Sequence, residues 1–209
     1  MIRVLIVDDH AIVRRGLKEI LACEPDFVVS ETGDPTEAMS LIRAESWDLV
    51  VLDLDLPQKS GLDLLKNVKH ERRDIPVLIL SVYPEEQFAL RTIEAGASGF
   101  VSKDSAPEDL VKAIRKLLKG EKYVSERMAE RLLYRIATSV EAHPHDSLSA
   151  REFQILCLFG AGKAVSEIAT ELSLSAQTVS TYRARMLEKM GLRTTGELMR
   201  YAIQNGLAP

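Results

Sequence analysis

The first half of the chain alternates between two kinds of hydrophobic pattern. Short apolar runs rich in β-branched residues occur at Arg3–Val7, Phe27–Glu31, Leu49–Asp53, Val77–Ser81 and Gly99–Ser102. Between and after these runs lie segments with helical periodicity, roughly Ile12–Cys23, Pro35–Glu45, Gly61–Glu71, Glu85–Ala95 and Pro107–Lys119. The alternation predicts an α/β fold in which a doubly wound, five-stranded parallel sheet carries helices on both faces.

The pattern changes after residue 122. Ser125–Ala137 has one apolar and one charged face, which predicts a helix within a linker. From Ser149 onward the pattern is all-α, and helices predicted at Val165–Leu172 and Ala176–Met190 are joined by a tight connection. Such a helix pair is typical of a helix-turn-helix module. The predicted parts are residues 1–122, a linker at 123–146, and a smaller domain at 147–209.

Composition refines this picture. The 209 residues suffice for two modest domains. Residues 1–122 carry 17 basic and 22 acidic residues, whereas residues 147–209 carry 7 and 5, which suggests that the two halves have different partners. Cys23 and Cys157 both lie among apolar neighbours at helical spacing, so we expect buried free thiols in a reducing compartment. His143 and His145 resemble a metal pair, but without further ligands a solvated loop is favoured.

The sequence also bears on location. The opening residues Met1-Ile2-Arg3 run directly into a predicted strand, without a basic and then apolar leader. No apolar run approaches the roughly 20 residues that span a bilayer. We therefore expect a cytoplasmic protein with no membrane partner.

Polar side chains stand at the carboxyl ends of the predicted strands. Asp8-Asp9 follow the first strand, Asp53 ends the third, Ser81 ends the fourth, and Lys103 comes just after the fifth. These ends meet at one edge of a parallel sheet, where ligands bind in such folds. Because carboxylates that meet there raise one another's pKa, a Mg²⁺ ion with water and phosphate ligands would relieve the conflict. The set predicts a carboxylate nucleophile, a metal ion, and two groups for phosphoryl oxygens.

Each of these residues has a plainer explanation when it is taken alone. Asp53 could cap a turn, and Asp8-Asp9 could cap the next helix. Lys103 could be an ordinary solvated surface lysine. Their joint position at strand ends, in the right order, favours the phosphoacceptor interpretation.

The same residues carry a family resemblance. Val4-Leu5-Ile6-Val7-Asp8-Asp9-His10, Asp53 followed by Pro57 and Gly61, Ser81, and the run from Gly96 to Lys103 resemble the flavodoxin-like receiver domain of two-component response regulators. The resemblance implies that Asp53 accepts a phosphoryl group from a sensor histidine kinase. It also implies a Mg²⁺ site in which Asp9 binds directly and Asp8 through water, with Asp53 and the backbone carbonyl of Asp55.

The resemblance further assigns a switch to Ser81 and Phe100. The serine hydroxyl would turn toward the phosphoryl group and the aromatic ring would swing inward, although an aromatic residue in a last strand is otherwise ordinary core. Tyr83 is bulkier than many receivers have at that position, and Asp55 is acidic beside the acceptor. We hypothesise that Tyr83 screens the acyl phosphate from water.

The second half resembles another family. The series Leu148-Ser149-Ala150-Arg151-Glu152, Glu167-Ile168-Ala169 and Thr178-Val179-Ser180-Thr181-Tyr182 resembles the LuxR-type DNA-binding domain. Joined to a receiver, it resembles the NarL/FixJ class of response regulators. Ala164 departs from the pattern, since a capping serine is frequent there, so the helix that follows is expected to fray slightly.

The predicted helix Ala176–Met190 is the candidate for reading DNA. At about 100° per residue, Val179, Met186 and Met190 fall on a buried face and short polar residues on the opposite one. The predicted contacts to double-stranded DNA are Gln177, Thr178, Ser180, Thr181, Tyr182, Arg183, Ala184, Arg185 and Lys189. Arginines would hold phosphates. Because the residues in the base-reading positions are short, specificity is expected to depend partly on water, DNA shape and the spacing of a homodimer.

Three functions compete on the sequence. The first is a phosphorylation-activated transcription regulator that is not an enzyme. The second is a small acyl-phosphate phosphatase that uses the same carboxylates, although it leaves the C-terminal helices unexplained. The third is a DNA-binding protein with an inactive receiver, although inactive receivers usually lack part of the acidic set that is complete here. The last helix, with Leu198, Tyr201 and Ile203, fits a dimer face and a core face equally well.

Overall fold

The computed structural model describes residues 1–56, 60–83, 85–126, 128–130 and 143–207. The chain forms two compact units, Met1–Ala137 and Thr138–Pro209, and each is considered by itself. Pro57 and most of the predicted linker helix lie outside the described residues.

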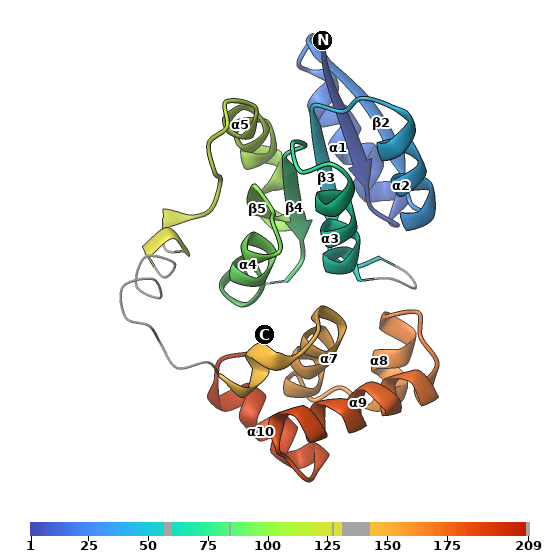
Figure 1. Ribbon diagram of the computed structural model, residues 1–209, viewed down its shortest axis with the longest axis vertical. Coiled ribbons are helices and arrows are strands. Elements are labelled where there is room, and N and C mark those ends of the chain that lie inside the picture. Colours follow the sequence, from blue (N-terminus) through green and yellow to red (C-terminus); the bar gives the residue numbers. More distant parts are fainter. Residues whose placement is uncertain (57–59, 84, 127, 131–142, 208–209) are drawn as a thin grey trace. The chain divides into compact units, whose positions relative to one another are not determined.

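The first unit is built on a five-stranded parallel sheet with the strand order β2-β1-β3-β4-β5 (Figure 1). The strands are β1 (Ile2–Val7), β2 (Phe27–Thr32), β3 (Leu49–Asp53), β4 (Val77–Ser81) and β5 (Gly99–Ser102). The helices are α1 (Ala11–Ala22), α2 (Pro35–Ala44), α3 (Gly61–Glu71), α4 (Glu85–Glu94) and α5 (Ala106–Leu118), with the short 3-10 helix η1 (Lys103–Ser105) before the last. The predicted α/β fold is confirmed, and most bounds agree within one residue.

Two helical layers enclose this sheet. Helices α1 and α5 pack side by side on one face, and α2 packs beside α3 on the other. Strand β3 is buried at every position, as its unbroken apolar run requires in a central parallel strand. Because side chains alternate along a strand, Val4 and Ile6 of β1 join the core beneath α1 and α5. The central strands are thereby buried between the two helical layers, and their carboxyl ends lie at the same edge of the sheet.

After α5 ends, the chain returns to the sheet and runs beside β5. Tyr123 forms a parallel bridge with Gly99 of β5, and its carbonyl accepts a hydrogen bond from the Phe100 amide at 2.8 Å. An added Cβ at Gly99 would lie 2.7 Å from the Tyr123 oxygen, so glycine permits this close approach. The first linker residues are therefore bonded to the strand that carries Phe100.

The second unit is all-α. It contains the 3-10 helix η2 (Pro144–Ser147) and the helices α7 (Ala150–Gly160), α8 (Val165–Glu171), α9 (Ala176–Met190) and α10 (Thr195–Gln204). Helix α7 packs on α9 and α10, and α8 packs on α9. Ser149 begins α7 with the predicted capping box, in which its hydroxyl and the Glu152 carboxylate satisfy each other's backbone amides. The predicted helix-turn-helix pair is α8 and α9.

Two expectations need correction or refinement. Cys23 is exposed rather than buried, because it follows the last turn of α1 on the solvent side; Cys157 is buried, and both are free thiols. Ala164 offers α8 no side-chain cap. The carboxylate of Glu167 accepts a hydrogen bond from the Ala164 amide at 2.6 Å and thereby stabilises the N-terminus of α8.

Candidate functional site

The carboxyl edge of the sheet brings the predicted acidic residues together. The side chains of Asp8 and Asp53 are almost wholly buried, whereas Asp9 is exposed. Ligand atoms of Asp8, Asp9, His10 and Asp53 all lie within 4.8 Å of one another. Three carboxylates at this spacing form a hard, oxygen-rich donor set of the kind that Mg²⁺ prefers.

Lys103 is the cation of this cluster. Its ammonium lies 2.7 Å from Asp53 Oδ2 and 2.7 Å from Asp8 Oδ2, and only 12 % of its side chain is exposed. The fifth strand ends at Ser102, so η1 turns Lys103 back over the strand ends. One ammonium therefore serves two buried carboxylates, and the set retains an excess negative charge that a divalent cation would neutralise.

The electrostatic consequence appears at Asp53. Burial, together with the neighbouring Asp8 carboxylate and against the influence of Lys103, raises the pKa of Asp53 to about 7. Burial lowers the pKa of Lys103, but the two carboxylates outweigh it and the pKa is raised overall. A further cation at this edge would favour the ionised form of Asp53.

Backbone contacts hold the carboxylates in place. Asp53 Oδ1 accepts a hydrogen bond from the Asp55 amide at 3.1 Å, and Asp8 Oδ1 accepts one from the His10 amide at 2.8 Å. Gly61 donates to the Leu54 carbonyl at 3.0 Å, and an added Cβ there would lie 2.1 Å from the Asp53 carbonyl oxygen. Glycine at position 61 therefore lets α3 begin directly against the backbone of Asp53.

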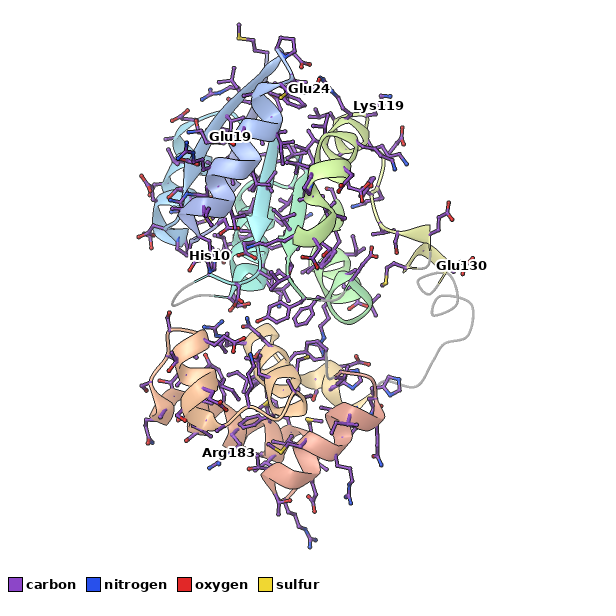
Figure 2. All side chains as sticks on the ribbon, turned by 180° about the vertical axis from the view of Figure 1, so that it is seen from behind. His10, Glu19, Glu24, Lys119, Glu130 and Arg183 are labelled. Atoms are coloured by element: carbon purple, nitrogen blue, oxygen red, sulfur yellow. The ribbon has the colours of Figure 1, made fainter. Side chains whose placement is uncertain are left out.

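His10 and Arg14 also contribute to this edge, although the sequence analysis did not predict their contacts. The Nδ1 atom of His10, at the start of α1 (Figure 2), lies 2.7 Å from the Asp9 carboxylate, and Arg14 donates to the Asp8 carbonyl at 2.7 Å. The histidine directly follows Asp8-Asp9 in the sequence, so its closeness was available as a signal. The contact of Arg14 depends on the angle at which α1 leaves the sheet, which no local pattern reveals.

Ser81 and Phe100 stand on neighbouring strands. Ser81 pairs with Ser102 in the register of β4 and β5 and is fully buried, and its hydroxyl accepts from the Tyr83 amide at 3.1 Å. Phe100 pairs with Ile79 and is 2 % exposed. The serine therefore lies at the functional edge, and the aromatic ring lies in the core.

Tyr83 follows Ser81 by two residues, after the end of β4. Its hydroxyl donates to Asp55 Oδ2 at 3.2 Å, and its ring stacks on Phe88 with centroids 4.6 Å apart. Asp55 in turn follows Asp53 by two residues. The phenol thus joins the loop that leaves β4 to the loop that leaves β3.

Helix α9 has the surface that its sequence predicts. Val179, Met186 and Met190 are buried, and Gln177, Thr181, Ala184 and Arg185 are exposed. Ser175 caps the helix by accepting from the Thr178 amide at 3.0 Å. Arg183 (Figure 2) and Tyr182 are half-buried on the flanks.

Two polar contacts within the second unit were not predicted. Lys189 lies 2.7 Å from the Glu152 carboxylate, and Arg151 donates to the Leu172 carbonyl at 2.9 Å and to Gln154. The first joins α9 to α7, and the second joins α7 to the end of α8. Both hold the helix-turn-helix pair in its orientation.

Comparisons with known proteins decide the family. Residues 4–115 match the response regulator receiver domain, and residues 146–202 match the luxR family of bacterial regulatory proteins. The chain is a response regulator of the NarL/FixJ class. This response regulator is a phosphorylation-dependent, DNA-binding transcription regulator and not an enzyme. The phosphatase alternative is thereby set aside.

Relatives match the response regulator along its full length. Response regulator UvrY of Escherichia coli K12 and response regulator GacA of Pseudomonas aeruginosa are each 35 % identical over 209 residues, which is 99 % of this chain and 96 % and 98 % of those proteins. RcsB of Salmonella enterica serovar Typhimurium, solved bound to promoter rprA with the phosphomimetic BeF₃⁻, is 27 % identical with a TM-score of 0.62. That match covers 96 % of this chain and 98 % of RcsB. Within the described part of the response regulator, no helix is long and apolar enough to cross a membrane.

Proposed function

We propose that Asp53 is the phosphoacceptor of this response regulator. The observation that carries the proposal is the convergence of Asp8, Asp9 and Asp53 with Lys103 at one sheet edge. Asp53 ends the buried central strand β3, which lies between β1, after which Asp8 follows, and β4, which ends at Ser81. A sensor histidine kinase is the proposed donor.

In phosphoryl transfer, each residue of the site would have a separate role. A carboxylate oxygen of Asp53 attacks phosphorus, and the donor's nitrogen leaves. Lys103 transfers its contacts from the carboxylates to the phosphoryl oxygens, and the Ser81 hydroxyl donates to another oxygen. Asp8, Asp9, Asp53 and the Asp55 carbonyl are the proposed ligands of Mg²⁺, which when bound supplies positive charge beside the transferring group.

The linker provides a direct connection from this site toward the DNA-binding unit. When Ser81 turns to the phosphoryl group, the space that it leaves beside β5 favours a shift of Phe100, and the Phe100 amide is bonded to the Tyr123 carbonyl. A movement of Phe100 is therefore transmitted to the first residues of the linker. We propose residues 1–122, 123–146 and 147–209 as receiver, linker and DNA-binding domain, with Tyr123 as the point where receiver and linker join.

Helix α9 is the proposed recognition helix. Ser180, Thr181 and Ala184 would approach base edges. Gln177, Thr178 and Tyr182 would lie beside the sugar-phosphate backbone of the DNA. Among the described residues, Arg183 and Arg185 have no ion-pair partner, so they are available for phosphates. Lys189 is the exception in the predicted set, because its ion pair with Glu152 favours a structural role.

A homodimer on double-stranded DNA in the cytoplasm completes the proposal. RcsB has been solved as two dimers bound to two parallel DNAs, with 28 % identity and a TM-score of 0.60 to this chain. Exposed Ile203 on α10 offers an apolar contact for a second copy, whereas Leu198 on the same helix is core. One module with few basic residues binds weakly, so pairing on a two-part site would supply the missing affinity.

The proposed recognition helix is tested by binding to DNA that the phosphorylated protein selects from a random pool. Arg183→Ala and Arg185→Ala should each weaken binding to all sequences and lower the slope of log affinity against log salt by about one. Thr181→Ala should instead change the ranking of selected sequences. Arg200→Ala, an exposed arginine on α10, is the matched control and should bind as the wild type does. Loss of binding in the control with none in the α9 variants would exclude α9.

Tyr83 is proposed to protect the acyl phosphate from water. Tyr83→Ala removes both the phenol that bonds Asp55 and the ring that stacks on Phe88, so the phosphoryl lifetime should fall several-fold. Tyr83→Phe keeps the ring and should retain most of the lifetime. The measurement is decay of the phosphorylated protein after donor removal, and an unchanged or longer lifetime in Tyr83→Ala would disprove the protection.

A further inference from the structure

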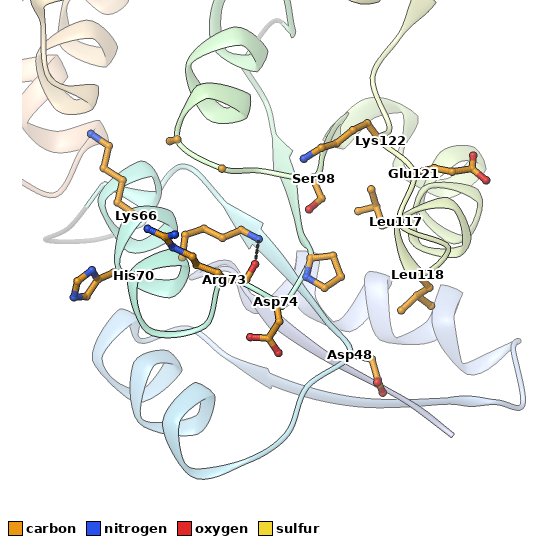
Figure 3. A pocket seen from close by; sticks show the side chains of 15 residues that line it. Asp48, Lys66, His70, Arg73, Asp74, Ser98, Leu117, Leu118, Glu121 and Lys122 are labelled. Carbon is orange, nitrogen blue, oxygen red and sulfur yellow. Dashed lines mark hydrogen bonds between the residues drawn. The ribbon is translucent and has the colours of Figure 1, made fainter.

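A groove of about 840 Å³ lies in the first unit at the edge of the sheet opposite Asp53 (Figure 3). The end of α3, the start of β4, the loop between α4 and β5, and the residues that follow α5 form its walls. Its volume falls within the range of small-molecule sites. The phosphotransfer chemistry uses none of its residues.

Two lysines converge on this groove from different elements. Lys69 of α3 donates to the Ile75 carbonyl at 2.6 Å, and Lys122, which follows α5, donates to the Ala97 carbonyl at 3.0 Å. In the part of the chain that the structure describes, neither ammonium has a carboxylate within ion-pair distance. Backbone carbonyls position both ammoniums instead. Lys69 also donates to the Arg73 carbonyl at 3.5 Å, so one proton of Lys69 and two of Lys122 remain for a ligand.

The charges of these lysines act on each other. Burial and the positive charge of Lys122 lower the pKa of Lys69. The stem of Lys69 packs toward Gly96, whose added Cβ would lie 3.0 Å from Lys69 Cγ, so the side chain has little room to turn away. An anion between the two ammoniums would relieve their repulsion, and the fixed stem lowers the entropy cost of binding it.

Most of the groove's carboxylates are already engaged. Asp74 pairs with Arg72 through both of its oxygens, and Asp48 accepts from the Arg3 amide at 2.7 Å. Glu121 is exposed on the rim and is the remaining acid of the described lining. The described lining holds the cations Lys66, Lys69, Arg73 and Lys122 against the acids Asp48, Asp74 and Glu121, so it carries a small excess of positive charge.

The rim and one wall add further recognition. Arg73 stands on the α3 side of the groove and Lys122 on the α5 side (Figure 3). Leu117, Leu118 and Pro76 line an apolar surface beside these charges. A guanidinium and two ammoniums suit a group with several phosphoryl oxygens, and the apolar wall suits a flat, weakly polar ring.

We propose that this groove binds a small molecule that carries a diphosphate group. The phosphates contact Lys69, Lys122 and Arg73, and the rest of the molecule lies against Leu118 and Pro76. The site is separate from Asp53 and requires no divalent cation.

The test uses the full chain, freed of divalent cations so that the carboxylate edge does not capture phosphate. Inorganic pyrophosphate, ADP and adenosine are titrated by calorimetry and by amide NMR. Pyrophosphate and ADP should shift the amide signals of Gly96, Ser98 and Lys122, and adenosine should not. Lys69→Met and Lys122→Met should each weaken binding about tenfold, as loss of one charge-assisted contact does.

Lys18→Met is the matched control, since it removes the same charge from α1, and it should bind as the wild type does. The site is refuted if neither pyrophosphate nor ADP binds, if adenosine binds as tightly as ADP, or if both groove variants bind normally. Shifts centred on Asp53 and Lys103 instead of the groove also refute it. Should Lys69→Met fold poorly, the exposed Lys122 carries the test alone.

Discussion

Asp53→Asn should abolish acyl-phosphate formation. With a small phosphate donor and Mg²⁺, the wild-type chain should gain the mass of one phosphoryl group, and the variant should gain none, because an amide lacks the nucleophilic oxygen anion. The substitution keeps the size of the side chain and removes a buried charge, so the fold should survive it. Intact-protein mass spectrometry with sensitivity to hydroxylamine provides the measurement.

Asp55→Asn is the matched control for that experiment. It neutralises the neighbouring carboxylate and leaves the backbone carbonyl that we assign to Mg²⁺. The control should still take up one phosphoryl group, even if its lifetime changes through the lost contact with Tyr83. Phosphorylation of Asp53→Asn at the wild-type level, or none in Asp55→Asn, would refute the assignment of the acceptor.

Lys103→Met should destabilise the first unit strongly at pH 8 in the absence of divalent cations. The change leaves two buried carboxylates without their shared ammonium, and breaking a buried pair costs about 3 kcal/mol of unfolding free energy. Urea unfolding followed by the fluorescence of Trp47 is suitable, because the chain has one tryptophan and it is buried in this unit. Mg²⁺ should restore much of the loss.

The pH dependence of this effect follows from Asp53. Its pKa in the folded state is about 7, above the ordinary value of 3.8, so its contribution to stability is fully present below that ordinary value and is lost as the pH rises through 7. Lys103→Met should therefore cost less at pH 5, where Asp53 is protonated, than at pH 8. In the Asp53→Asn background the cost should shrink at both pH values.

Lys112→Met, on the exposed side of α5, is the control and should change stability by less than about 0.5 kcal/mol. An equal loss at pH 5 and pH 8, or a full loss in the Asp53→Asn background, would show that Lys103 does not stabilise the fold through these carboxylates.

Much of this architecture was predictable, because the decisive signals are local. The apolar run at Leu49–Asp53 is a buried central strand, and parallel topology then places its last residue beside Asp8 and Lys103. The face of α9 that holds Val179 and Met186 follows directly from a 100° periodicity. These features follow from local sequence patterns together with the rule that the carboxyl ends of parallel strands lie at one edge of the sheet.

The remaining features depend on contacts between distant residues. The bond from Phe100 to Tyr123 requires the chain to return along β5, and nothing in the periodicity after α5 indicates it. The ion pair of Lys189 with Glu152 joins residues 37 positions apart, so the sequence pattern of α9 does not indicate it. The exposure of Cys23 likewise depends on whether the last turn of α1 places it toward the sheet or toward solvent.

Control of DNA binding by phosphorylation can be tested by measuring acyl phosphate and DNA binding on one sample. Wild-type protein is partly phosphorylated, applied to immobilised DNA carrying its selected sequence, and the bound and unbound fractions are analysed by mass. Phosphorylated chains should be enriched in the bound fraction, and Asp53→Asn protein should show no gain in binding after donor treatment. Equal proportions of phosphorylated protein in both fractions would contradict control of DNA binding by phosphorylation.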